Sequence, residues 1–265
     1  MASFEVPNAY FSAPVSEFIG ANPDAVLGEL TRKSGFAVDE TQRDAWRSEI
    51  LILKECLPGV EGTLFLEFEV PRLGSRIDAV LVAGSAVFVL EFKVGANRFN
   101  ELDTFQAWDY ALDLKNFHRA SRDATIYPIL VATEAKSDQL SLGVPADDFV
   151  FPPIRCSRGN LFNALRLGLA RPGRVPIDPV EWATAAYRPT PTIIEAARAL
   201  YAHHTVEDIN TYDASKRNLA VTSKRVEAII DAACREGRKA IVFVTGVPGA
   251  GKTLIGLNEI GRAHV

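Results

Sequence analysis

The sequence is short of cysteine, of long apolar runs and of basic charge, and each shortage excludes a class of protein. Its three cysteines, Cys56, Cys156 and Cys234, lie far apart with no Cys-x-x-Cys pair or Cys/His cluster, which excludes a disulfide framework and a zinc site of the usual spacing. No apolar stretch approaches the roughly 18 residues of a membrane-spanning helix. Because the first ten residues also lack the basic-then-apolar pattern of a secretory signal, we expect a cytoplasmic protein with no membrane partner.

Acidic residues outnumber basic ones, 33 against 29, so the chain has no overall basic field for nucleic acid. Any such binding has to come from local patches. Two segments, 154–177 and 215–225, carry several arginines or lysines and no acid, and we expect them to contact nucleic acid; the alternative is an ordinary solvated surface. A length of 265 residues allows one large domain, or one domain and part of another, and the sequence indicates no oligomeric state.

Apolar periodicity predicts an α/β fold. The strongest helix covers 39–57, where Trp46, Ile50, Leu53 and Leu57 share one face. Further helices are expected over 12–33 (broken at Gly20 and Pro23), 101–117, 160–170, 191–204 and 218–236, and strands over 63–70, 76–82, 86–94, 127–133 and 239–245.

Two of the predicted strands carry more detail. Alternation over 63–70 predicts one face made of the apolar residues Leu64, Leu66, Phe68 and Val70. The strand over 86–94 is apolar on both faces apart from Glu91 and Lys93, which predicts a central position in the sheet.

A nucleotide-binding motif lies near the C-terminus. Residues 246–253, GVPGAGKT, fit the P-loop pattern GxxxxGK[ST] between an apolar segment and a helix start. Gly246, Gly249 and Gly251 let backbone N–H groups converge on phosphates. Lys252 would reach the β- and γ-phosphates of ATP, and Thr253 would ligate Mg²⁺. The alternative interpretation is a glycine-rich turn before a helix.

The last seven residues, 259–265, resemble the translation of a sequencing adapter, so we expect them to be non-native and the natural protein to continue beyond Asn258. A genuine continuation of the helix is the alternative. A P-loop domain needs further strands and a second acidic motif. We therefore expect no measurable ATP turnover from the 265-residue chain, and exposure of the apolar side chains that the missing strands would cover: Ile241, Phe243, Ile255 and Leu257.

Two acids fall on neighbouring predicted strands. If Gly84-Ser85 forms a two-residue hairpin turn, counting back along both strands places Asp78 directly opposite Glu91. Like charges opposed on a strand pair are destabilising unless a cation lies between them. We therefore expect Asp78 and Glu91 to bind Mg²⁺ or Mn²⁺ together.

Lys93 follows Glu91 by two residues and projects from the same face of the strand. This set suits metal-assisted phosphodiester hydrolysis. Two carboxylates hold a metal ion that lowers the pKa of bound water, and the lysine orients or deprotonates that water or stabilises the transition-state oxygens. The alternative is a pair of solvated charges on an exposed sheet face.

Three further residues belong to the candidate site. Glu49 lies on the apolar stripe of helix 39–57. It is either another metal ligand or a charged residue at the edge of the stripe. Gln106 and Tyr110 are one turn apart on helix 101–117, so their side chains reach one spot. They would contact DNA or brace Lys93, unless they belong to an ordinary amphipathic face.

The order of these residues, from Glu49 through Asp78 and Glu91-Phe92-Lys93 to the QxxxY element ending at Tyr110, resembles the PD-(D/E)xK nuclease superfamily. The QxxxY element is similar to the branch typified by the RecB nuclease domain. The resemblance covers roughly residues 39–135 and implies an αβββαβ core that cleaves with Mg²⁺. Ile77 stands where the superfamily usually has proline.

With the P-loop included, the chain resembles bacterial proteins that join such a nuclease to a Schlafen group 3-like DNA/RNA helicase domain. We expect a fold with a restriction-endonuclease-like αβββαβ core, a helical linker, and the first strand, loop and helix of a P-loop NTPase. The expected segments are an N-terminal helical segment (1–38), the nuclease domain (39–171), linker and helices (172–237), the start of the helicase domain (238–258) and the tail (259–265).

The function expected from this is that of an ATP-dependent DNA/RNA helicase fragment with an N-terminal metal-dependent nuclease domain. One alternative is an ATP-binding protein whose N-terminal domain binds nucleic acid without cleaving it. The other is a signalling or chaperone-type ATPase with an unrelated sensor domain. Mg²⁺-dependent cleavage separates the first two, and lack of nucleic-acid binding would favour the third.

Overall fold

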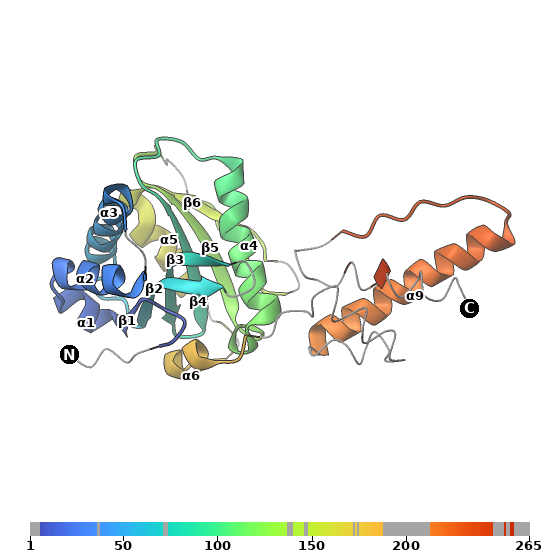
Figure 1. The fold of residues 1–265 in the computed structure, drawn as a ribbon, viewed down its shortest axis with the longest axis horizontal. Coiled ribbons are helices and arrows are strands. Elements are labelled where there is room, and N and C mark those ends of the chain that lie inside the picture. Colours follow the sequence, from blue (N-terminus) through green and yellow to red (C-terminus); the bar gives the residue numbers. More distant parts are fainter. Residues whose placement is uncertain are drawn as a thin grey trace. The chain divides into compact units, whose positions relative to one another are not determined.

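The computed structural model describes residues 6–35, 38–70, 74–136, 140–145, 148–171, 173, 175–187, 213–245 (backbone alone over 213–220), 252 and 255–256. The chain divides into two units, Met1–Ala186 and Tyr187–Val265. The first unit is α/β, as predicted, with a six-stranded mixed sheet and helices on both of its faces (Figure 1).

The first unit begins with a strand and three helices. They are β1 (Phe11–Pro14), α1 (Val15–Gly20), α2 (Pro23–Lys33) and α3 (Glu40–Cys56). Asn22 caps α2 by accepting from the Asp24 backbone N–H, and Asp39 caps α3 by accepting from that of Gln42. The apolar stripe of α3 is buried, so the predicted helix and its packing face are confirmed.

The expected helix over 12–33 is wrong in its first part. Residues Phe11–Pro14 form a strand, which pairs antiparallel with the second strand of the sheet and places Phe11 opposite Leu66. The helices begin at Val15, directly after Pro14. Four residues carry too little periodicity to distinguish a strand from a helix, and here the tertiary pairing decides.

The sheet follows the order of the chain, β1-β2-β3-β4-β5-β6. Pairing is antiparallel from β1 to β4 and parallel from β4 to β6, with α4 (Glu101–Phe117) as the connection between β4 and β5. The strands after β1 are β2 (Thr63–Val70), β3 (Ser75–Ala83), β4 (Ala86–Lys93), β5 (Thr125–Ala132) and β6 (Ile154–Cys156). The predicted central position of β4 is confirmed.

A two-residue turn at Gly84-Ser85 joins β3 to β4. Ala83 pairs with Ala86, and the same register continues to the pair Ala79–Leu90, as the turn predicted. Gly84 has a φ of +60°, which glycine adopts without steric cost and which the first position of a type II′ turn requires.

The predicted faces of β2 are wrong from Phe68 onward. Phe68 lies on the same face as Phe65, since both rings contact Trp182, at centroid distances of 5.0 and 5.5 Å. Residues three apart on a regular strand face opposite ways. The cause is Glu67, whose φ of +51° is left-handed backbone and reverses the alternation within the strand.

Helices cover the sheet on two sides. The core on one face joins α1, α2, α3 and α5 (Leu161–Leu169) to side chains such as Leu64, Leu81 and Phe88. The other face carries α4 and α6 (Pro179–Thr184), with Trp182 of α6 fully buried (Figure 1). Helix α4 begins after its cap Asn100, a few residues beyond the end of β4. It then packs against β4 on this face of the sheet.

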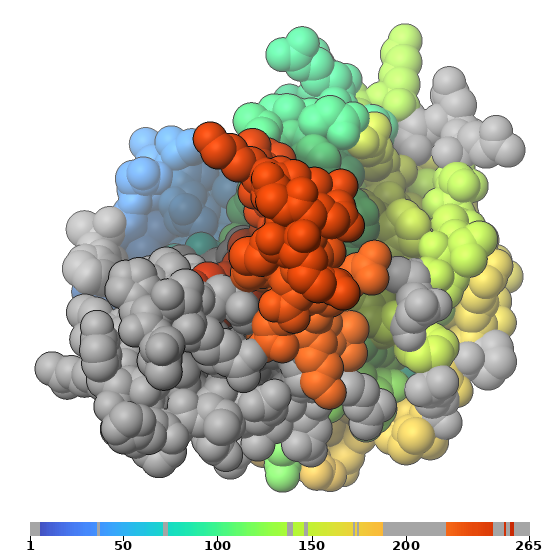
Figure 2. Space-filling view, turned by 90° about the vertical axis from the view of Figure 1, so that its right-hand side faces the viewer, coloured from blue at the N-terminus to red at the C-terminus, as the bar shows by residue number. Residues whose placement is uncertain are grey.

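In the second unit, α9 (Asp213–Arg235) is the main described element; it is orange in Figure 1, and its residues from 221 onward are orange in Figure 2. The strand expected over 239–245 is wrong, because residues 238–245 adopt no regular secondary structure. Ile241 and Phe243 are exposed as expected, whereas Ile255, at 4% exposure, is buried. The expected helix 191–204 and Leu257 lie outside the described residues. In the part of the chain that the structure describes, no helix combines the length and apolar character that crossing a membrane requires.

Candidate active site

Four of the predicted site residues are joined in one chain of hydrogen bonds. The Lys93 ammonium donates to Glu91 Oε1 at 2.9 Å and to Gln106 Oε1 at 3.1 Å, and Gln106 Nε2 donates to Tyr110 Oη at 3.1 Å. Lys93 also lies 3.8 Å from Asp103 Oδ1. The strand β4 supplies the acid and the lysine, and α4 supplies the amide and the phenol. The sequence allowed Gln106 to contact DNA, to brace Lys93 or to belong to an ordinary helix face. The structure contains the contact with Lys93.

Asp78 lies beside this chain on β3. The ladder between β3 and β4 ends at Ala79–Leu90, one pair short of the predicted pair of Asp78 with Glu91. In place of a backbone acceptor, Asp78 Oδ2 accepts the Phe92 backbone N–H at 2.7 Å. Backbone pairing between β3 and β4 therefore ends just before Asp78 and Glu91. Beyond that point the side chain of Asp78 keeps the two strands in contact.

The alternative of solvated charges on an open sheet face is wrong for Glu91, which is 3% exposed. Its Oε1 atom accepts from Lys93, but its Oε2 atom is buried and has no hydrogen-bond partner among the described residues. A buried carboxylate oxygen without a donor is costly, and this oxygen is available to a cation or to water.

Glu49 faces the same cluster from α3, as its place on the packing stripe suggested. It is 8% exposed. Burial raises the pKa of Glu49 to about 8, and the nearby charges of Glu67 and Glu91 act in the same direction. Glu49 thus carries a proton at neutral pH unless a cation approaches it.

The pKa values of Asp78 and Glu91 are raised as well. Burial raises the pKa of Asp78, the charges of Glu91 and Glu49 raise it further, and the Phe92 N–H opposes them. Burial also raises the pKa of Glu91, against the attraction of Lys93. One lysine therefore faces several acids, and ionising all of them would create an excess of negative charge that a cation would relieve.

The lysine itself is held in its charged form. Burial disfavours the ammonium, but attraction to Glu91 and the hydrogen bond between them outweigh it, so the pKa of Lys93 is raised. Burial likewise raises the pKa of Tyr110, whose phenol also bonds Ser75. At neutral pH both groups are hydrogen-bond donors.

Sequence reasoning missed two acids of the cluster, Asp103, which lies beside Lys93, and Glu67. Glu67 Oε1 accepts from Trp46 Nε1 at 2.7 Å, and Glu67 Oε2 accepts from Arg76 Nε at 2.6 Å. Ladder pairs on either side of Glu67 place it across from Asp78. The one signal for Glu67 in the sequence was an acid in the middle of an apolar strand, which alternation assigned to the opposite face.

Whether these residues suit Mg²⁺ can be judged from the donors present. No three His, Cys, Asp or Glu side chains are arranged as a metal site within the described ranges. Mg²⁺, however, is usually bound by one or two carboxylates and completes its shell with water and phosphate oxygens. The partnerless Glu91 Oε2, beside Asp78 and among several acids, fits this kind of site.

Two of the arginines of segment 154–177 are engaged by acids from elsewhere in the fold. Arg155 forms an ion pair with Glu101 at 2.7 Å, and Arg158 forms a forked pair with Glu55 at 2.6 Å. Arg166 and Arg171 lie over aromatic rings. The segment has no acid of its own, yet its positive charge is partly neutralised by the tertiary structure.

The P-loop residues are described in one position only. Lys252 is helical and half-buried, whereas Gly246, Gly249, Gly251 and Thr253 lie outside the described residues, as does the tail 259–265. The loop's predicted phosphate contacts therefore stay a prediction.

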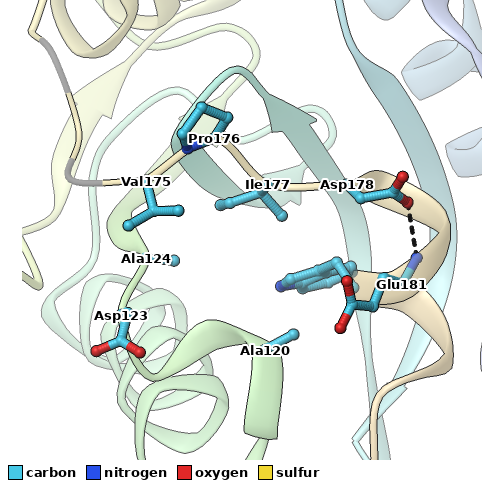
Figure 3. Close-up of a pocket in the computed structure, with 9 residues that line it drawn as sticks. Ala120, Asp123, Ala124, Val175, Pro176, Ile177, Asp178 and Glu181 are labelled. Carbon is cyan, nitrogen blue, oxygen red and sulfur yellow. Dashed lines mark hydrogen bonds between the residues drawn. The ribbon is translucent and has the colours of Figure 1, made fainter.

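A cavity of about 210 Å³ lies away from the carboxylate cluster and contains none of the predicted site residues (Figure 3). Segment 175–178 forms one wall, and Ala120, Asp123 and Ala124 lie on the other; Trp182 also lines the cavity. Asp178 points its carboxylate toward the α6 backbone, where it caps that helix. Asp178 therefore has a structural role at this cavity.

Comparison of the chain with family models, with curated proteins and with solved structures gives no match in any of the three.

Proposed function

We propose that the first unit hydrolyses phosphodiester bonds of DNA or RNA with a divalent metal ion, as a nuclease of the PD-(D/E)xK type with a RecB-like QxxxY element. The observation that carries this proposal is the hydrogen-bonded chain from Glu91 through Lys93 and Gln106 to Tyr110. The αβββαβ order implied by the resemblance agrees with the succession α3-β2-β3-β4-α4-β5.

Each residue has a role in this proposal. Asp78 and Glu91 hold Mg²⁺ or Mn²⁺, with Glu49 as a further oxygen donor once it loses its proton. The bound metal lowers the pKa of its water and neutralises charge on the phosphate. Lys93 donates to the oxygens that gain charge during attack; its raised pKa makes it a poor base, which favours this role over deprotonating water. Gln106 and Tyr110 hold the ammonium in place.

We also propose that residues 246–253 bind ATP as part of a helicase domain. The support is the motif itself, together with the helical conformation of Lys252. A protein that carries the complete domain should hydrolyse ATP, should be stimulated by DNA or RNA, and should lose this activity on Lys252→Ala.

The nuclease is tested with the 265-residue chain and end-labelled DNA and RNA, single-stranded and duplex, in Mg²⁺ or Mn²⁺ and in excess chelator. We expect metal-dependent cleavage that falls by about 10²–10³-fold or more in Lys93→Ala and in Asp78→Asn. Lys136→Ala, a change at an exposed lysine, is the matched control and should cleave normally. Equal cleavage by all three variants would reject the site, and binding without cleavage by the wild type would indicate a nucleic-acid-binding module.

A further inference from the structure

The backbone at Glu67 is unusual in a way that concerns the site. A non-glycine residue with φ near +51° inside a strand is uncommon, and such residues cluster at functional sites. On an extended strand Glu67 would share a face with Phe65, whose ring packs against Trp182. The left-handed backbone instead turns the carboxylate toward Trp46 of α3.

Two donors then fix the orientation of this carboxylate. The Trp46 indole binds one oxygen and the Arg76 guanidinium binds the other, so neither oxygen is left to rotate toward solvent. Trp46 is buried, and Arg76 is itself held over the ring of Tyr10 at 4.9 Å. An acid anchored this firmly contributes a fixed negative charge.

That charge is placed among the predicted metal ligands. The pairs Leu66–Ala79 and Phe68–Ile77 put Glu67 across from Asp78, whose carboxylate accepts the Phe92 backbone N–H next to Glu91. Glu67 contributes to the raised pKa values of Glu49, Asp78 and Glu91. All three neighbours therefore experience its charge, although both of its oxygens are occupied by other partners.

We propose that Glu67 is a positioning residue of the site: its anchored carboxylate strengthens divalent-cation binding at Asp78 and Glu91 without ligating the cation. The inference rests on the proposed function, because it requires a cation at these two acids. Residues that act from outside the ligand set in this way commonly change metal affinity by about 10–100-fold.

The test is calorimetric titration of the 265-residue chain with Mn²⁺, in which the binding that Asp78→Asn abolishes defines the site. Glu67→Gln should weaken this binding about tenfold or more. Glu69→Gln, an equal change of charge at an exposed position two residues along the same strand, should leave it unchanged. In cleavage assays Glu67→Gln should need more Mn²⁺ but reach the wild-type rate at saturation, a separation that a general loss of structure would not produce.

Glu67→Gly covers the case in which glutamine disturbs the fold, because glycine adopts a positive φ without strain. It should melt cooperatively and show the same weakened binding. Wild-type affinity in both Glu67 variants would overturn the inference and leave the proposed function standing. Absence of any Asp78-dependent Mn²⁺ binding in the wild type would overturn both.

Discussion

Lowering the pH from 7 to 4 should destabilise the first unit through His118, the residue that follows α4. Its side chain is 1% exposed and packs against Trp182 and Phe68, with centroids 4.7 and 6.2 Å apart. Ser121 Oγ lies 2.8 Å from His118 Nδ1 and accepts the Trp182 indole N–H. The hydroxyl keeps a proton that it can donate to Nδ1, an arrangement open only to a neutral imidazole.

The size of the effect follows from the pKa. Burial lowers the pKa of His118 to about 4, with the charge of Arg119 acting in the same direction, from 6.5 in an unfolded chain. Between these two values the unfolded state binds more protons, so the free energy of unfolding falls as the pH falls. A difference of this size corresponds to about 3 kcal/mol, a large part of the 5–15 kcal/mol typical of a domain.

Other groups act in the opposite direction. The raised pKa values of Glu49, Asp78 and Glu91 mean that the folded state binds protons more readily, so their contribution grows as the pH falls and is lost as it rises. The total pH dependence therefore mixes both signs. Comparing the wild type with His118→Gln removes the shared contribution, since glutamine does not titrate and its carbonyl oxygen can accept from Ser121.

The measurement is urea unfolding followed by near-ultraviolet circular dichroism at several pH values from 7 to 4. The stability advantage of the wild type over His118→Gln should shrink by about 3 kcal/mol across this range, most of it below pH 6.5. An advantage that stays constant with pH would refute a buried neutral imidazole.

Two further substitutions test the packing of the first unit by thermal denaturation. Lys54→Met removes an ammonium that donates to three carbonyl oxygens around the end of α1 and should cost about 1–3 kcal/mol, whereas Lys136→Met at an exposed site should cost nothing. Gly168→Ala would place a Cβ atom 2.5 Å from Phe88 Cε1 and should cost about 1–3 kcal/mol, while Gly28→Ala, which meets open space in a helix, should stabilise by about 0.5–1 kcal/mol. Unchanged melting in Lys54→Met or Gly168→Ala would contradict the contacts described.

Much of the first unit could be predicted because its signals are local. The helix over 101–117 and the strand over 63–70 have the observed bounds, and the Gly84-Ser85 turn alone fixed the register of β3 against β4. When a turn has two residues, the residues on either side of it pair with each other, and this sets every later pair along the two strands. This register brings Asp78 and Glu91 onto adjoining strands, although the ladder ends one pair before them.

The features that the sequence did not predict depend on tertiary structure. Residues 11–14 form a strand because β2 is there to pair with them, and their own pattern is too short to show it. The reversal at Glu67 depends on one backbone angle, which no periodicity reports, and it hid both the true face of Phe68 and the acid opposite Asp78. The ion pairs of Arg155 and Arg158 join residues 54 and 103 positions apart, beyond the reach of any local count of charge.

The two edges of the sheet are its shortest strands, β1 with four residues and β6 with three. An edge strand exposes unpaired N–H and C=O groups on which a strand from another molecule can assemble. Pro14 closes β1 with a residue that has no N–H to offer. The long strands lie inside and are paired on both sides, so the unit presents little template for ordered aggregation. Concentrated solutions of it should stay free of fibrils, with the apolar strands β4 and β5 protected by their place in the order.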